Sequence, residues 1–189
     1  MKNAGAANRP LSELELIQRA VSGDPAAFAA LYDVYVEQIY RFIFFRVSNE
    51  QTAEDLTSQV FLKAWDNLGS YQIRGLPFRA WLFRIARNSI IDYYRTYKET
   101  TPLEPAALTQ PDPSAEVDEV VDQRLQAEAL RLALQRLTED QRQVLTLRFI
   151  EGLSTEEVAQ VMGKRQGAIR ALQMRGLQAL AQIIETFDE

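Results

Sequence analysis

Two groups of basic side chains are the residues best equipped for chemistry in this sequence. From residue 163 to residue 176 there are four basic and no acidic residues. From residue 78 to residue 98 there are five basic residues and one acidic residue, which is a net charge of +4. Cationic side chains that gather without acidic partners bind phosphates, so both groups predict contact with nucleic acid.

Aromatic residues are interleaved with the second group. At about 100° per residue, Arg84, Arg87 and Asn88 share one side of a helix. Such cations hold a nucleic-acid backbone while nearby rings stack on unpaired bases. The candidates for this contact are Tyr71, Phe78, Arg79, Trp81, Arg84, Arg87 and Asn88. The alternative is that Trp81 and Phe83 belong to the core and that the arginines only face solvent, and the sequence leaves it open.

Composition narrows the classes of function. The chain has no cysteine and no histidine, which excludes disulfides, thiolate metal sites and the most common general base of enzymes. Neither a phosphate-binding loop nor a pocket of paired carboxylates is visible, so we expect no catalysis, no cofactor and no metal. No apolar run approaches the roughly 20 residues of a membrane span, and residues 1–10 lack the apolar core of a secretion signal. We therefore expect a cytoplasmic protein without membrane insertion.

The acidic residues are segregated along the chain. The formal net charge is −5 over 189 residues, yet residues 99–123 hold seven acidic and no basic residues, so the remainder carries −5 + 7 = +2. The same stretch contains four of the seven prolines and no aromatic residue. Such a segment cannot bury enough apolar surface to fold alone. It predicts an acidic linker between two small domains.

Both blocks that flank this stretch are predicted to be helical, so the fold class is all-α. In the first block, Ser12 and Glu15 form a capping pair that begins a helix. Pro25 suits the first turn of the next helix, which we expect to continue to about Val47 with aromatic residues packed in its core. Pro77 begins the helix that carries the arginine stripe.

A helix predicted over residues 53–65 has two different faces. The face expected to point into the core holds Ala53, Leu56, Val60 and Ala64. Asp55 and Gln59 lie on the polar side, and Leu62 lies there among them. An apolar side chain in that position suggests contact with another protein. The alternative, a lone exposed leucine, is common in folded proteins and stays open.

The second block predicts a helix-turn-helix from Leu153 to Leu180. Ser154 and Glu157 form a capping box for its first helix, which ends at Gly163. Ile169, Leu172 and Gly176 point inward from the second helix. Arginine and glutamine can read the edges of guanine and adenine, and lysine binds phosphates. The candidates for contact with duplex DNA are Lys164, Arg165, Gln166, Arg170, Ala171, Met174 and Arg175. The alternative is a basic amphipathic helix without a role in DNA binding.

Three stretches in this order resemble one family. They read "AEDLTSQVFLKAW", "PFRAWLFRIARNSIIDYYR" and, after the acidic spacer, "LTEDQRQVLTLRFIEGLSTEEVAQVMGKRQGAIRALQMRGLQAL". Together they are similar to bacterial sigma factors of the extracytoplasmic-function group in the sigma-70 family. The similarity covers about residues 24–98 and 125–182.

The resemblance implies that different segments of the chain have different functions. Residues 10–98 would form sigma region 2, which binds the polymerase core and the −10 element. Residues 99–124 would be the flexible acidic linker, and residues 125–186 would form sigma region 4, which binds the −35 element. The implied partners are core RNA polymerase (through the clamp helices of its largest subunit and through its flap), promoter DNA and an anti-sigma factor.

The resemblance also implies roles for individual residues. Asp55, Gln59 and Leu62 would dock on the clamp helices, which gives the isolated leucine a reason. The seven residues of the aromatic and basic group would hold open the −10 element. The seven residues of the second basic helix would read the −35 element as duplex.

Three functions compete at this point. The first is a sigma factor without catalysis of its own. The second is a helix-turn-helix regulator that binds operators as a dimer and uses the first block as a sensor. The third is an enzyme, which the missing histidine and cysteine disfavour. The arginine stripe and its aromatic neighbours favour the first, because a sensor domain needs neither.

Overall fold

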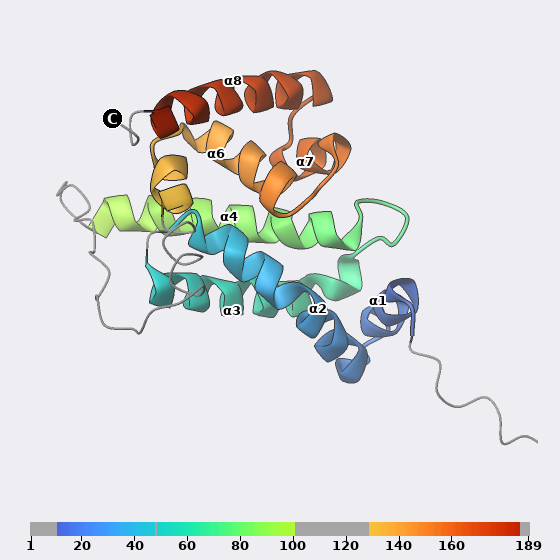
Figure 1. Ribbon diagram of the computed structural model, residues 1–189. Coiled ribbons are helices and arrows are strands. Elements are labelled where there is room, and N and C mark those ends of the chain that lie inside the picture. Colours follow the sequence, from blue (N-terminus) through green and yellow to red (C-terminus); the bar gives the residue numbers. More distant parts are fainter. Residues whose placement is uncertain (1–10, 48, 101–128, 186–189) are drawn as a thin grey trace, which may run out of the picture.

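A computed structural model describes residues 11–47, 49–100 and 129–185 (Figure 1). Every regular element among these residues is a helix, as the periodicity predicts. The helix that carries the arginine stripe continues to Thr100. The rest of the predicted acidic linker, residues 101–124, lies outside the described residues. Within the described part of the chain, no helix is both long and apolar enough to cross a membrane.

Four helices and a short 3-10 turn build the N-terminal half, which we define as residues 11–100. They are α1 (Glu13–Val21), α2 (Pro25–Phe44), α3 (Glu50–Asn67), η1 (Leu68–Ser70) and α4 (Phe78–Thr100). The predicted capping box at Ser12 is confirmed, because its amide donates to Glu15 Oε2 at 2.7 Å and its hydroxyl accepts from the Glu15 amide at 3.3 Å. The Asp24 carboxylate caps α2 through the amides of Ala26 and Ala27.

The core of the N-terminal half lies between α2, α3 and α4. The predicted inward face of α3 is confirmed, since Ala53, Leu56, Val60 and Ala64 are all buried. The aromatic residues of α2 differ in how far they are buried. Phe42 is fully buried and meets Phe83 edge-on with ring centroids 5.3 Å apart, whereas Tyr32 stays 40% exposed. Phe83 is therefore a core residue, as the alternative interpretation held.

The C-terminal half, residues 129–185, begins with a helical stretch over residues 129–135. It continues through α6 (Glu139–Leu145), η2 (Thr146–Ile150), α7 (Thr155–Met162) and α8 (Gln166–Glu185). η2 is a turn of π-helix that the periodicity did not predict. Val144 of α6 and Leu147 of η2 are fully buried, while Phe149 of η2 remains 55% exposed.

α7 and α8 form the predicted helix-turn-helix. Ser154 caps α7 with Glu157 as expected. Gly163 ends α7 with φ of +65°, a left-handed conformation that favours glycine. Gly176 faces Leu145, and a Cβ at this glycine would lie 3.2 Å from Leu145 Cγ. The absence of a side chain at residue 176 thus sets how closely α8 packs on α6.

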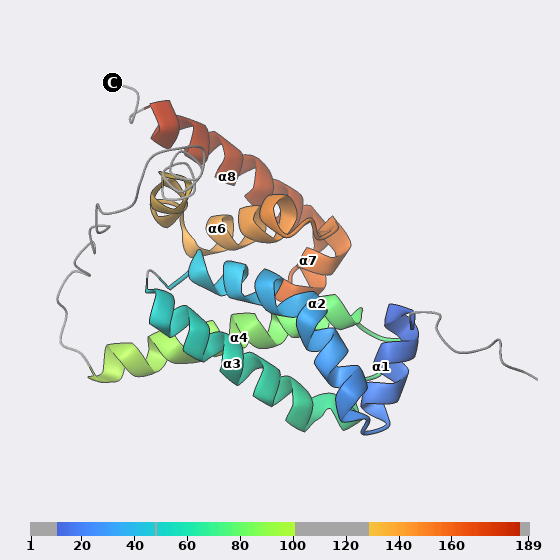
Figure 2. The same cartoon turned by 60° about the horizontal axis from the view of Figure 1, so that its bottom comes forward.

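The two halves pack on each other, which the sequence did not predict. α7 rests against α4, and Figures 1 and 2 both show α6 and α7 lying over the layer formed by α2 and α4. Val144, Leu147 and Leu153 belong to the same buried cluster as Leu82 and Ile90 of α4. The two halves therefore share one large buried cluster, beside which Phe45, Leu134, Leu137 and Leu145 form a second, smaller one.

Candidate nucleic-acid interface

The exposed face of α3 offers an apolar cleft as well as polar groups. Asp55 and Gln59 are exposed, and Leu62 is 65% exposed. Leu62 borders a cleft of about 580 Å³ between α2 and α3, whose walls include Tyr32 and Trp65. The predicted leucine is thus one edge of an apolar surface and not an isolated side chain.

Most of the aromatic side chains around α4 are buried in the core. Tyr71 is 9% exposed and Phe78 is 3% exposed, and their rings meet edge-on with centroids 5.4 Å apart. The Tyr71 hydroxyl donates to the Leu76 carbonyl at 2.8 Å. Burial leaves neither ring a free face in this arrangement, and their contact with bases stays a prediction. Trp81 is half-buried and lies on both rings, with centroid distances of 5.0 Å and 5.5 Å.

The arginine stripe of α4 is divided by the packing of the two halves. Arg84 and Asn88 are exposed, as predicted for residues that contact a nucleic-acid strand. Arg87 is half-buried, and its Nε donates to Gln143 Oε1 of α6 at 3.4 Å. This arrangement leaves the outer part of the stripe accessible and covers its inner part.

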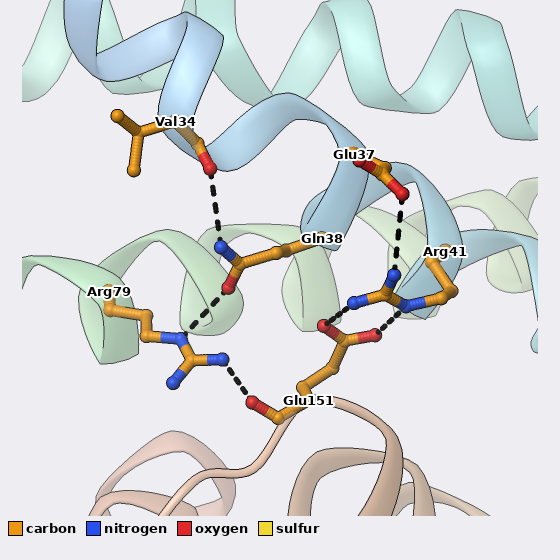
Figure 3. Close-up of polar contacts among 6 residues, drawn as sticks. All are labelled: Val34, Glu37, Gln38, Arg41, Arg79 and Glu151. Atoms are coloured by element: carbon orange, nitrogen blue, oxygen red, sulfur yellow. Dashed lines mark hydrogen bonds and ion pairs between the residues drawn. The ribbon is translucent and has the colours of Figure 1, made fainter.

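Arg79 lies in a polar network that joins the halves (Figure 3). Its Nε donates to Gln38 Oε1 at 3.0 Å, and its Nη2 donates to the Glu151 carbonyl. The Glu151 carboxylate is fully buried and accepts from Arg41 Nε at 2.8 Å and from Arg41 Nη2 at 2.9 Å. This carboxylate raises the pKa of Arg41. The prediction that Arg79 faces DNA does not hold in this arrangement, because its guanidinium binds the C-terminal half.

The second basic group lies on the outer side of the helix-turn-helix. Arg165, Gln166, Arg170, Ala171 and Arg175 are exposed, and Met174 is 65% exposed. The predicted inward residue Ile169 is fully buried. Arg165, just before α8, and Arg170 and Arg175 of α8 therefore supply exposed cations to the helix-turn-helix, separated by small, polar and apolar residues.

Two contacts brace this helix. Lys164, just before α8, pairs with Asp140 of α6 at 3.0 Å. Arg148 donates to the Leu153 carbonyl, and its Nε donates to Gln173 Oε1 at 3.3 Å. Gln173 is half-buried, and its hydrogen bond with Arg148 helps to hold the turn. Within the described ranges, no group of carboxylates is arranged to hold a metal ion.

Comparison with known proteins decides which family combines these two faces. The model of Sigma-70 region 2 matches residues 31–100, and that of Sigma-70, region 4 matches residues 127–180. The chain is 41% identical over 174 residues to the ECF RNA polymerase sigma factor BldN of Streptomyces coelicolor, with 90% of this chain and 65% of BldN covered. It is 30% identical to ECF RNA polymerase sigma factor SigX of Bacillus subtilis, with 86% of each covered.

The chain belongs to the extracytoplasmic-function group of the sigma-70 family. It is therefore a sigma factor, a transcription initiation factor that directs RNA polymerase to promoters. The competing description, a regulator that binds operators as a dimer, is not favoured.

Solved structures support the fold of the sigma factor. CnrH in complex with the cytosolic domain of CnrY matches with a TM-score of 0.73 at 25% identity, over 92% of this chain and 97% of CnrH. RpoE of Bartonella quintana, solved with the anti-sigma factor NepR, matches with a TM-score of 0.67 at 24% identity, over 84% of this chain and 96% of RpoE. The second match concerns the fold alone.

Proposed function

We propose that this sigma factor uses each of its halves for a different part of promoter recognition. Residues 10–98 bind core polymerase and the −10 element, residues 125–186 bind the −35 element, and residues 99–124 link them. The observation that carries this division is that α4 and α8 expose separate basic faces on the two halves. The factor has no catalysis of its own, and it acts in the cytoplasm, where polymerase and promoters meet.

Core polymerase binds the exposed face of α3. Asp55 and Gln59 supply polar contacts to the clamp helices of the largest subunit, and Leu62 inserts an apolar side chain. Leu62 and the neighbouring cleft form an apolar surface rimmed by polar groups, which is typical of a protein interface. Truncation of such a central apolar anchor commonly weakens binding more than loss of a contact at the rim.

The −10 element binds along the accessible part of α4. Arg84 and Asn88 follow the backbone, and Trp81 presents the exposed part of its ring to a base. Tyr71 and Phe78 act from beneath, because they pack against Trp81 and fix the loop before α4. Arg79 and Arg87 reach the strand only when the C-terminal half moves away from α4, since both now bond to it.

The −35 element lies against α8 as duplex DNA. Arg165, Gln166 and Arg170 face the bases or the adjacent phosphates, and Arg175 extends the contact along the helix. Ala171 lets the backbone approach the groove, and Met174 packs on its wall. Lys164 reaches a phosphate by exchanging its ion pair with Asp140. In the holoenzyme the flap of the polymerase holds this half at the distance that the promoter requires.

An anti-sigma factor is a further partner. RpoE was solved with the anti-sigma factor NepR, and CnrH was solved with the cytosolic domain of CnrY. An inhibitor can bind the exposed apolar face of α3 and the surfaces of the two halves. Core polymerase needs the same surfaces. We therefore expect binding of the inhibitor and of core polymerase to be mutually exclusive.

Run-off transcription with core polymerase tests the proposal. The wild-type factor should direct initiation from candidate promoters, and Leu62→Ala should lower its affinity for core about 10-fold or more, because a buried apolar anchor is lost. Leu14→Ala is the matched control, since Leu14 is 52% exposed on α1 and far from the cleft along the chain. Tight operator binding as a free dimer, without binding to core, would refute the proposal. Equal core affinity of Leu62→Ala and wild type would refute the docking face alone.

A further inference from the structure

A cleft of about 610 Å³ lies where the two halves meet. It is lined by residues from the end of α2, from α4 and from α6, namely Arg46, Ile90, Ile91, Tyr94, Arg95, Glu139 and Arg142. Three of these seven side chains are cationic and one is anionic. Promoter recognition and core binding, as proposed above, use none of them.

The hydrogen bonding of Arg46 is the clearest indication that this cleft binds a ligand. Its side chain is 1% exposed, yet only its Nη2 has an anionic partner, the carboxylate of Glu139. Its Nε and Nη1 are buried and have no hydrogen-bond acceptor among the residues that the structure describes. Nearly all buried polar groups in folded proteins are paired, and a buried cation with unpaired donors is costly. The guanidinium thus has room for a second acceptor.

Arg142 faces the same space with the same deficit. Its Nη2 donates to the Gln135 carbonyl at 3.3 Å, while its Nε is buried without an acceptor. Burial lowers the pKa of Arg142, and burial followed by the charge of Arg142 lowers the pKa of Arg46 to about 9. The charge of Arg142 thus disfavours the charged form of Arg46, whose carboxylate partner, Glu139, is 54% exposed.

We propose that this cleft is an oxyanion site, in which Arg46 and Arg142 receive the oxygens of one phosphate or carboxylate group. Guanidinium groups suit this task because their donors form a planar fork that matches such oxygens. The Tyr94 hydroxyl is held by the Arg46 carbonyl at 2.5 Å and fixes the floor beside them. Ile90 and Ile91 form an apolar wall, which excludes water from the bound group and strengthens its charge interactions.

Two sources can supply the oxyanion. One is a free phosphate or a small phosphorylated molecule. The other is the chain itself, whose residues 101–124 hold six carboxylates and follow directly after α4. Since Arg46 belongs to one half and Arg142 to the other, an occupied site stabilises only the packed arrangement of the halves. The inference does not depend on promoter recognition.

Thermal unfolding of the full chain with inorganic phosphate, at constant ionic strength set with chloride, tests the site. Phosphate should raise the Tm by roughly 3–5 °C at ten times its Kd. Arg142→Gln should abolish this response, and Arg46→Gln should do the same if it folds. Arg19→Gln is the matched control and should respond as wild type does, because Arg19 is 53% exposed on α1.

A second arm separates the two sources. If the chain's own carboxylates fill the site, phosphate leaves the wild-type Tm unchanged. Replacing the six acidic residues between 101 and 124 by their amides should then lower the Tm and create the phosphate response. Replacing only residues 116, 118 and 119 serves if the larger change prevents folding. The proposal is overturned if phosphate shifts neither wild type nor the amide variant, or if Arg142→Gln responds as strongly as wild type.

Discussion

Residue Trp81 shows how burial sorts side chains of one chemical type into two roles. Three aromatic rings were candidates for stacking on bases, and the structure buries Tyr71 and Phe78 while leaving part of Trp81 accessible. The buried rings support the accessible one from below. A ring that its neighbours already hold in place loses little conformational entropy when a nucleotide stacks on it. The buried pair therefore contributes to binding by fixing the position of Trp81.

Arg170 is the residue on which reading of the −35 element is best tested. Its side chain is exposed on α8, so Arg170→Ala should leave folding intact and remove a contact to a base or phosphate. We expect a loss of about 1–3 kcal/mol at promoters that depend on a −35 element. Promoters with an extended −10 element should lose less, as measured by run-off transcription.

Gln178→Ala is the control for Arg170→Ala, because Gln178 is exposed on the same helix outside the candidate set. It should leave both promoter classes unaffected. An equal loss at both classes in Arg170→Ala would indicate that the arginine does not read the −35 element.

At the scale of elements, the helix-turn-helix depends on where two of its glycines, Gly163 and Gly167, lie. Gly163 ends α7 with φ of +65°, and Gly167 lies in the first turn of α8 with nothing within 4 Å of an added Cβ. The same substitution should therefore act in opposite directions. Gly163→Ala forces a side chain into a left-handed conformation at a cost of about 1–2 kcal/mol.

Gly167→Ala is the matched variant and should stabilise the protein by about 0.4–1 kcal/mol, because alanine restricts the unfolded chain and favours helix. Unfolding in denaturant measures the free energies of both variants against wild type. If Gly163→Ala were as stable as wild type, the left-handed end of α7 would not limit the turn.

At the scale of the whole molecule, a buried carboxylate connects the two halves. Glu151 is fully buried and accepts two bonds from Arg41, while its carbonyl accepts from Arg79 (Figure 3). The network covers part of the surface that we propose for the −10 element. In the packed arrangement Arg79 and Arg87 are hydrogen-bonded to the C-terminal half, and promoter binding must break these bonds.

Glu151→Gln should loosen this arrangement. The amide cannot neutralise Arg41, and we expect a loss of about 1–3 kcal/mol, limited by the 37% exposure of the Arg41 side chain. A fluorophore pair, one in each half, should report a lower transfer efficiency in the free factor. Glu37→Gln is the control, since Glu37 pairs with Arg41 at 3.6 Å but is 85% exposed. An unchanged separation in Glu151→Gln would show that the halves stay packed without the Arg41–Glu151 ion pair.

The amino-acid sequence by itself determined the local features of this sigma factor. Capping boxes at Ser12 and Ser154, the inward face of α3 and the turn at Gly163 were all predicted correctly, because each depends on residues within one or two helical turns. The order of three motifs around an acidic stretch also sufficed to indicate the family, which the comparisons confirmed.

Only the tertiary structure decided how the halves meet. Arg41 and Glu151 lie 110 positions apart, so no periodicity or spacing connects them. The same holds for Arg46 and Glu139, which lie in different halves. Local patterns report which side of a helix is apolar, but not which distant element covers it. That choice follows from the packing of all the helices at once.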